Sequence, residues 1–198
     1  QFLLAAYQVE VGPNRRFFAF RLHQFVSAGG DVHSSLEAPG RRYLTLKGQK
    51  YQPNAGRQAL LYPVVFCRSC GQEFHPVWAH LHNRRPERFE PREFSDDSSL
   101  RERDVVNGYL MPDAEAAYEV EDLEKARLPD GWLEADRDGE LVLKKTYREF
   151  APVPCRVKAD GGTSSDGTPA WFLKGKFRFC PSCGVEHNVR GSEFRKLC

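Results

Sequence analysis

Apolar residues recur at the spacing of an α-helix near the beginning of the chain, in residues 15–27. They fall three or four positions apart, which places them on one side of a helix: Phe18, Leu22, Phe25 and Val26. Asn14 is of a residue type that caps helix N-termini, and Gly29-Gly30 follows the last apolar position. The pattern therefore predicts a helix over residues 15–27.

Six shorter runs, rich in β-branched, aromatic or leucine residues, predict strands. Three lie in the first part of the chain, at 32–37, 42–47 and 59–66, and three in the last part, at 141–143, 155–158 and 170–179. Ala38-Pro39-Gly40 provides a turn between the first two runs, and Pro63 places the third near the edge of a sheet. Two of the runs, 59–66 and 170–179, lead directly into pairs of cysteines.

The middle of the chain is polar and charged. Residues 83–103 hold six arginines and six acidic residues with little apolar content, which is typical of a solvated loop or linker. Residues 113–140 are acidic, with eleven Asp or Glu against three Lys or Arg. Within them we expect a helix over 114–127, which ends before Leu128-Pro129-Asp130-Gly131. Residues 160–169 (DGGTSSDGTP) predict a turn or mobile loop.

Composition indicates a globular chain with no strong charge. Of its 198 residues 40% are hydrophobic, and 29 Lys or Arg nearly balance 27 Asp or Glu, a net charge of +2. A stand-alone nucleic-acid-binding domain is usually far more basic, so any such contact would come from local patches. Three arginine pairs are candidates for phosphate contacts, although such pairs are far more often ordinary surface residues: Arg15-Arg16, Arg41-Arg42 and Arg84-Arg85.

The sequence indicates a cytoplasmic location and no membrane association. It has no apolar run approaching the ~18 residues of a membrane span. Residues 1–7 (QFLLAAY) lack a basic lead and are followed by Gln8 and Glu10, unlike a secretion signal. The chain begins without Met, so we expect a fragment or a processed product.

Four of the six cysteines form two closely similar Cys-x-x-Cys-Gly units, FCRSCGQE and FCPSCGVE. Two residues between the cysteines allow a tight turn that directs both sulfurs to one point, and the following glycine permits a positive φ. Two such knuckles supply a closed set of four thiolates, which is suited to a structural Zn²⁺. The predicted zinc ligands are Cys67, Cys70, Cys180 and Cys183.

Other interpretations of the cysteines are weaker. An iron–sulfur cluster uses the same ligands, and a single pair would also suit a disulfide or a redox motif. Cys155 is expected to be a buried strand cysteine, and Cys198 ends the chain. Four histidines near the knuckles are further candidate ligands, but with four thiolates available we expect them to lie outside the metal: His75, His80, His82 and His187.

Together these patterns predict an α+β domain with antiparallel strands around a split four-cysteine zinc ribbon, one or two helices and a charged insertion. The expected parts are residues 1–82 with the first knuckle, the insertion 83–140, and residues 141–198 with the second knuckle. As many as 109 residues separate Cys70 from Cys180, so the metal would join remote parts of the chain. Phosphate-binding loops, nucleophile elbows and His-Glu-x-x-His motifs are missing from the sequence, which gives no sign of a catalytic site.

Three stretches resemble one protein family. They are 18–37 (FAFRLHQFVSAGGDVHSSLE), 61–71 (LYPVVFCRSCG) with the following Gln-Glu, and 176–197 (KFRFCPSCGVEHNVRGSEFRKL). They are similar to the cysteine-bearing segment of very large bacterial DEAD/DEAH-box helicases, several of which belong to anti-phage defence systems. The resemblance covers residues 15–78 and 141–197 well and the acidic middle poorly. Arg21 and His23 match the family pattern without an assigned role.

The resemblance implies a segment between two motor lobes of an ATP-dependent helicase, without nucleotide-binding motifs of its own. We therefore expect a zinc-stabilised accessory domain that positions the lobes or guides DNA. The alternative is an interaction module that docks a partner subunit through the acidic residues 113–140. If zinc joins the more basic ends of the chain, phosphate contacts there would weaken steeply with salt, and deletion of the acidic insertion would tighten DNA binding.

Overall fold

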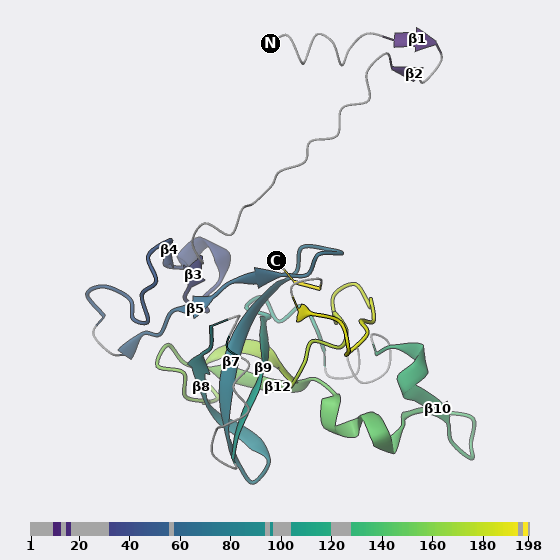
Figure 1. Ribbon diagram of the computed structural model, residues 1–198. Coiled ribbons are helices and arrows are strands. Elements are labelled where there is room, and N and C mark those ends of the chain that lie inside the picture. The colour runs from purple at the N-terminus through teal and green to yellow at the C-terminus, as the bar shows by residue number, and fades with distance from the viewer. Residues whose placement is uncertain are drawn as a thin grey trace.

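The computed structural model describes residues 10–12, 15–16, 32–55, 58–93, 96, 104–119, 128–193 and 196–197 (Figure 1). Its centre is a six-stranded, wholly antiparallel sheet with strand order β12-β13-β9-β7-β6, in which β8 also pairs with β7. The strands are β6 (Val65–Phe66), β7 (Glu73–His82), β8 (Arg85–Pro91), β9 (Val105–Pro112), β12 (Val153–Val157) and β13 (Thr168–Lys174).

Both faces of this sheet are buried, because its central strands carry apolar residues at consecutive positions. Trp171 and Leu173 of β13 pack on one face together with Phe74, whereas Phe172 of β13 packs on the other with Leu110. Such strands lack the alternation of apolar and polar residues that marks a sheet with one solvated face. The first face supports the cysteine loops, and the second is an interior core.

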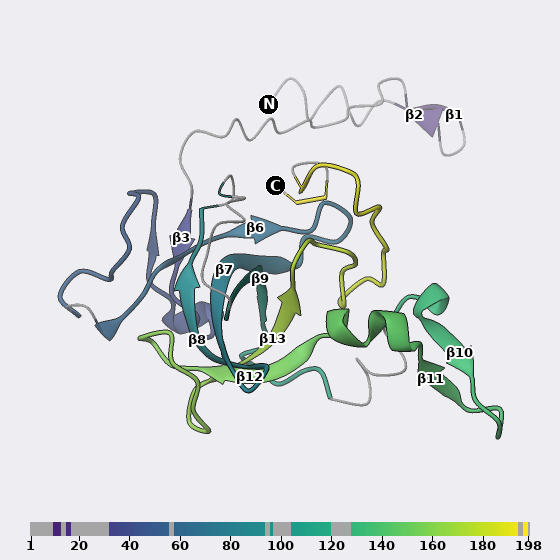
Figure 2. The same cartoon turned by 60° about the horizontal axis from the view of Figure 1, so that its bottom comes forward.

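The sheet curls so that β8 approaches the far strand β12, which Figure 2 shows as a partly closed ring of strands. Isolated bridges Arg88–Gly162 and Val157–Thr163 connect the loop after β12 to both strands. The interior core then fills the ring with side chains from five of the strands and the segments beside them: Leu36, Leu60, Tyr62, Val77, Ala79, Phe89, Leu110, Val157, Ala170 and Phe172.

The described residues also form three smaller sheets. A three-stranded sheet has the order β4-β3-β5, formed by β3 (His33–Ser34), β4 (Leu44–Thr45) and β5 (Tyr62–Pro63). A hairpin of β10 (Leu133–Ala135) and β11 (Leu141–Leu143) and a short pair, β1 (Glu10–Gly12) with β2 (Arg15–Arg16), complete the strands. The 3-10 helices within the described residues include η1 (Pro39–Arg41), η4 (Asp130–Trp132) and η5 (Lys145–Phe150).

The hairpin β10–β11 is held by a third apolar cluster built around Trp132. The Trp132 ring stacks on the Tyr147 ring at 4.8 Å between centroids, and it meets the Phe179 ring edge-on at 4.9 Å. Phe179 immediately precedes the second cysteine pair, so this cluster ties the hairpin to that knuckle. Figures 1 and 2 both show the hairpin extending away from the ring of strands.

The predicted strands are present, but most are shorter than expected. Leu141–Leu143 is confirmed as β11, and the run 170–179 forms β13, which ends at Lys174. The run 59–66 is divided into β5 and β6, because Tyr62–Pro63 pairs with β3 in the three-stranded sheet and Val65–Phe66 pairs with β7 in the central sheet. Overall the described chain is mostly antiparallel β, which confirms the β part of the predicted α+β class.

Two predicted helices differ from the structure where it describes them. Arg15–Arg16, the start of the expected helix 15–27, forms β2, and Asn14 and residues 17–27 lie outside the described residues. In the expected helix 114–127, residues 114–119 are turn and irregular backbone with Ala116 at a φ of 50°, and 120–127 are not described. No α-helix occurs in the described parts of the chain, where helical turns are of the 3-10 type.

The prediction of a loop over 83–103 is wrong for Arg85–Pro91, which is strand β8. Its polar side chains face solvent, but Phe89 is fully buried and the backbone pairs with β7 from Val77 to His82. The neighbouring β9 lies in the middle of the sheet. Within the expected charged insertion 83–140, β8 and β9 are therefore part of the central sheet, whereas β10 belongs to the hairpin that extends away from it.

Among the described residues, no helix has the length and apolar character needed to cross a lipid bilayer.

Gly161 sets the close approach of the loop after β12 to β8. Its φ is +87°, and a Cβ placed there would lie 2.2 Å from the carbonyl oxygen of Phe89. The carbonyl of Gly161 also accepts a hydrogen bond from the Phe89 N–H at 2.8 Å. We expect Gly161→Ala to lower the free energy of unfolding by about 2 kcal/mol or more, since the strain adds to a backbone clash. Urea unfolding measures this, with Gly131→Ala, where a Cβ meets nothing within 4 Å, as the control.

Candidate metal centre

The two Cys-x-x-Cys-Gly units adopt the same backbone turn. In the first, the N–H of Gly71 donates to the carbonyl of Cys67 at 2.8 Å, and the N–H of Cys67 donates to the carbonyl of Gln72 at 2.8 Å. In the second, Gly184 and Cys180 repeat these bonds at 2.8 and 3.0 Å. Gly71 and Gly184 have φ values of 79° and 71°, a left-handed conformation that favours glycine. The repeated sequence thus gives a repeated structure.

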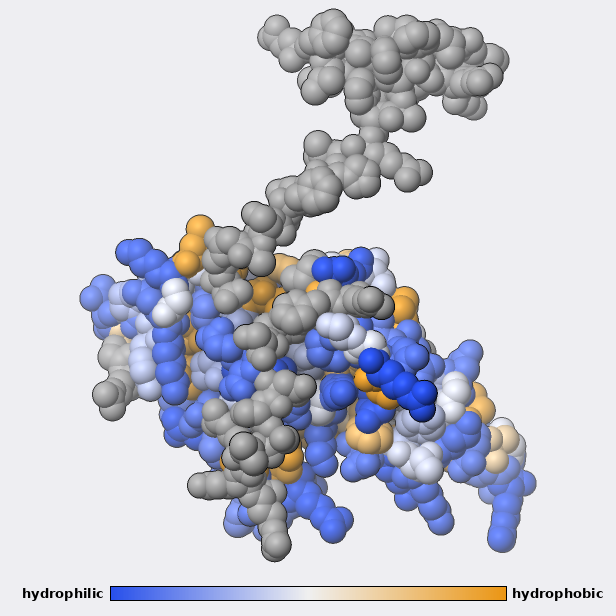
Figure 3. Space-filling model, in the orientation of Figure 1, coloured by the Kyte–Doolittle hydropathy of each residue, from blue (hydrophilic) through white to orange (hydrophobic). Residues whose placement is uncertain are grey.

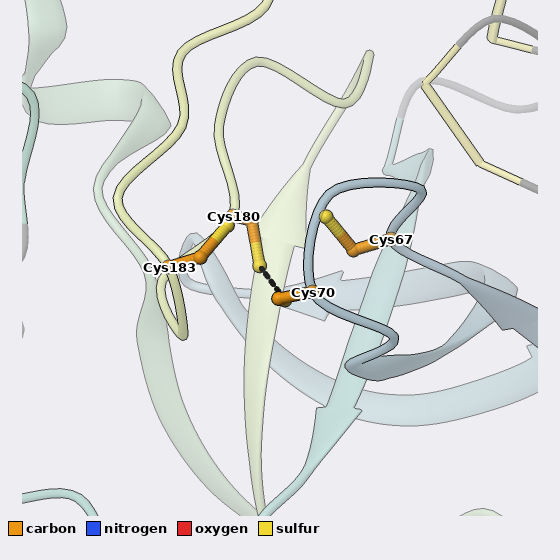
Figure 4. A group of neighbouring side chains, drawn as sticks. All are labelled: Cys67, Cys70, Cys180 and Cys183. Carbon is orange, nitrogen blue, oxygen red and sulfur yellow. Dashed lines mark hydrogen bonds between the residues drawn. The ribbon is translucent and has the colours of Figure 1, made fainter. Parts of the chain in front are cut away.

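The two turns face each other and bring the four predicted ligands together (Figure 4). Sulfurs of Cys67, Cys70, Cys180 and Cys183 all lie within 4.8 Å of one another. The sulfurs of Cys70 and Cys180, one from each turn, are 3.7 Å apart. A tetrahedral zinc with Zn–S bonds of roughly 2.3 Å requires sulfurs about 3.8 Å apart. The cluster therefore has the dimensions of a four-thiolate metal site.

The sheet fixes the position of both turns. The first turn joins β6 to β7, and the second follows β13 after residues that include Phe177. Beneath the sulfurs, Phe74 of β7 meets Phe177 edge-on at 4.9 Å between ring centroids. Cys67 and Cys180 are buried in this core, whereas Cys70 and Cys183 are exposed. A metal bound here would connect the hydrophobic core to the surface.

The end of the chain adds support to the first turn. Leu197 is fully buried and forms an antiparallel bridge with Cys67, and the N–H of Arg68 donates to the carbonyl of Lys196 at 3.0 Å. Tyr109 donates from its hydroxyl to a Glu193 carboxylate oxygen at 2.9 Å, and the same carboxylate accepts the N–H of Phe177. The segment after the second cysteine pair thus returns to the first pair and to the sheet.

The thiols differ in how readily they ionise without a metal. Burial raises the pKa of Cys180 and also that of Cys183. The pKa of Cys70 is lowered, because hydrogen bonds from the Gln72 backbone and the neighbouring thiols outweigh the opposing effect of burial. Metal ligands must be thiolates, so binding releases protons and its affinity falls at low pH.

The other candidate ligands lie elsewhere. Fully buried His75 forms a 3.0 Å ion pair from Nε2 to Glu73 and places Nδ1 3.0 Å from the Pro63 carbonyl, while His80 is 3.5 Å from Glu90. His82 is on the exposed end of β7, and His187 packs against Phe177. Cys155 is on β12, where burial raises its pKa to about 12. Cys198, Arg21 and His23 lie outside the described residues.

Sequence analysis did not single out the glutamate that ends each knuckle, although both units contain it at the same offset. Glu73 forms ion pairs with Arg42, which lies next to β4, and with His75. Glu186 instead accepts a hydrogen bond from Trp132 Nε1 at 3.1 Å. Each knuckle is thereby connected to a different flanking element. The repeat FCxSCGxE was the signal that could have identified them.

Glu73 gives a testable pH dependence. His75 and Arg42 lower the pKa of this partly buried carboxyl to about 2, although burial alone would raise it. A pKa below the unfolded value stabilises the fold above pH ~4.5 and loses that contribution as pH falls towards 2. At pH 7 we therefore expect the wild type to be more stable than Glu73→Gln by about 2–3 kcal/mol, and this advantage should stay nearly constant down to pH 5, which is still above the ordinary pKa of a glutamate.

Urea unfolding of both proteins with bound zinc, at pH 7 and at pH 5, measures this difference. Lower pH is avoided because protonation of the cysteines would release the metal from both proteins. Equal stability of the two proteins at pH 7 would contradict the assigned contacts of Glu73.

Comparison with protein-family models, with curated proteins and with solved structures gives no match to this chain.

Proposed function

We propose that Cys67, Cys70, Cys180 and Cys183 hold one structural Zn²⁺. The main support is that four sulfurs, from two turns separated by 109 residues, all lie within 4.8 Å of one another. Four thiolates complete a tetrahedron and leave no position for water or substrate, which argues for a structural metal and against a catalytic one. Soft thiolate ligands select zinc or an iron–sulfur cluster over hard cations.

Metal analysis of the purified protein tests this proposal. We expect about one zinc per chain and no charge-transfer absorption of iron and sulfur in the visible spectrum. A protein that folds without metal, or one that carries iron, would contradict the zinc assignment.

We further propose that this zinc-stabilised β domain is an accessory module of a DEAD/DEAH-box helicase, where it positions the motor lobes or guides DNA. The support is the resemblance of three stretches of sequence, two of which contain the knuckles. A closed metal site that ties two remote segments to one sheet suits a rigid spacer, because it limits relative movement of the chain on either side. The ATP chemistry would belong to other parts of the polypeptide.

The chain by itself is expected to have neither ATPase activity nor measurable ATP affinity, since it lacks the backbone loop and lysine that bind phosphates in such motors. A malachite-green phosphate assay and equilibrium dialysis with ATP measure the two properties. Turnover that persists through further purification would overturn the proposed role as an accessory module.

A second candidate, docking of a basic partner subunit, is favoured by the hairpin β10–β11. Its turn and strands carry four exposed acids against one arginine: Glu134, Asp136, Asp138 and Glu140 with Arg137. Leu141 and Val142 beside them are 54% and 36% exposed. Figure 3 shows a mostly hydrophilic face with separate apolar patches, one of them at the lower right over this hairpin. In the intact parent complex, Leu141→Ser with Val142→Ser should weaken subunit association measured by sedimentation, if this candidate is right.

A further inference from the structure

A groove of about 770 Å³ lies where β12, the start of β8, the loop after β12 and the segment after β9 meet. Its lining combines arginine, hydroxyl, aromatic and proline side chains, among them Arg85, Tyr118, Pro154, Arg156, Ser164 and Trp171. The volume is within the range of ligand-binding sites in proteins. None of the four proposed zinc ligands lines it.

The shape of the groove is fixed by backbone hydrogen bonds. The N–H of Thr163 donates to the carbonyl of Glu87 at 2.9 Å, and that of Ser164 donates to the carbonyl of Arg156 at 3.1 Å. These bonds hold the loop after β12 against both β8 and β12. Arg85 and Arg156, 71 positions apart in the sequence, therefore line one depression.

Both arginines are exposed and lack a carboxylate partner. Within the described residues, neither guanidinium lies within 4.0 Å of an Asp or Glu oxygen, and Arg156 only donates to the Gly167 carbonyl at 3.2 Å. Several other cations are paired, such as Lys158 with Asp160 and Lys174 with Glu149. The groove thus offers two forked donors to an anionic ligand.

One acidic side chain, Asp113, lines the groove, and its carboxylate already accepts hydrogen bonds from the protein. Asp113 is buried and its carboxylate accepts three hydrogen bonds, from the N–H groups of Ala117 and Tyr118 and from Trp171 Nε1, at 2.7, 3.1 and 3.3 Å. These donors disperse its negative charge and fix the aromatic wall. Repulsion of an anion by this residue is correspondingly reduced.

The edge of β12 does not suit an added peptide strand. The backbone groups of residues 154, 156 and 158 point away from β13. Those of Arg156 and Lys158 already form hydrogen bonds with the loop after β12. At the open end of that edge stands Pro154, which has no N–H to donate. A ligand of the groove must therefore be recognised mainly by side chains, as a phosphodiester backbone is.

We propose that this groove binds a short stretch of single-stranded nucleic acid, with Arg85 and Arg156 on successive phosphates and the Ser165 hydroxyl as a further donor. The inference deepens the proposed helicase role, because it locates the nucleic-acid contact. The depression, of about 770 Å³, has room for a short unpaired stretch of chain. Binding through phosphates has no strong sequence preference and weakens steeply with salt.

Fluorescence anisotropy with labelled oligo(dT), on zinc-loaded protein over a series of salt concentrations, tests the proposal. We expect Arg85→Ala and Arg156→Ala each to weaken binding on the order of tenfold, as for loss of a charged hydrogen bond. The double variant should lower the slope of log K against log salt by about 1.4, from two lost phosphate contacts. Arg148→Ala removes the same charge from η5, outside the groove, and should leave affinity and slope nearly unchanged.

Three results would overturn the proposal: no binding by the wild type at low salt, equal losses in Arg148→Ala and Arg156→Ala, or equal competition by oligo(dT) and polyglutamate. The last result would identify a general site for acidic chains. A metal content of one zinc per chain in every variant shows that the fold is intact. It also separates failure of this inference from failure of the zinc proposal.

Discussion

Cys180→Ser is expected to abolish zinc binding and to leave the domain unfolded or aggregated at 25 °C. Cys180 is fully buried at the base of the second knuckle, so a serine there would lack both the metal bond and access to water. Structural zinc sites contribute on the order of 10 kcal/mol of binding free energy, comparable with the whole stability of a domain. Circular dichroism and metal content, measured on the same preparation, test both parts of the expectation.

Cys155→Ser is the matched control. It makes the same chemical change at a partly buried cysteine of β12 that lies outside the sulfur cluster. We expect this variant to keep one zinc per chain and a near-native spectrum. Retention of full zinc content by Cys180→Ser, or equal damage from both substitutions, would show that the four sulfurs do not act as one site.

Phe74→Ala is expected to lower the free energy of unfolding by about 3–5 kcal/mol, the usual cost of deleting a buried aromatic side chain. Phe74 is fully buried on β7 between the two knuckles. Its ring meets Phe177, which in turn meets Tyr109 at 5.6 Å between centroids. Removal of the ring therefore leaves a cavity directly beneath Cys67 and Cys180. Urea unfolding in the presence of excess zinc measures the loss without a change in metal occupancy.

Phe74→Leu retains much of the volume and should cost only about 1 kcal/mol. The difference between the two substitutions then reports the cavity and not a general intolerance of β7 to change. If Phe74→Ala cost no more than Phe74→Leu, the core under the knuckles would be looser than the structure indicates.

The cysteine cluster could be predicted from sequence because its information is local. Two residues between cysteines and a glycine after them define the turn at Cys67 and again at Cys180, whatever the surrounding fold. The pairing of the two turns also followed, since a half-set of two thiolates leaves a tetrahedral metal incomplete. That sulfurs on turns 109 residues apart lie together in the structure agrees with this reasoning.

Strand β8 could not be predicted in the same way. It contributes one fully buried side chain, Phe89, and the rest of Arg85–Pro91 consists of charged residues and prolines, so neither composition nor alternation distinguishes it from a solvated loop. Its position depends on backbone pairing with β7, which the sequence of β8 does not encode. The prediction of a helix from residue 15 was wrong at Arg15–Arg16, which form β2. The pattern of apolar positions does not show that these residues pair with another strand.

The distance along the chain between the knuckles has a consequence for synthesis. Ribosomes add about 5–20 residues per second, so the second pair of thiols follows the first by roughly 5–20 s. During that interval Cys67 and Cys70 have only each other of the four predicted ligands, and β13, which leads to the second pair, joins β9 only shortly before that pair is made. The nascent domain must therefore keep two reactive sulfurs reduced until the C-terminal segment emerges. Its yield in cells should depend on the thiol redox state and on the supply of zinc during translation.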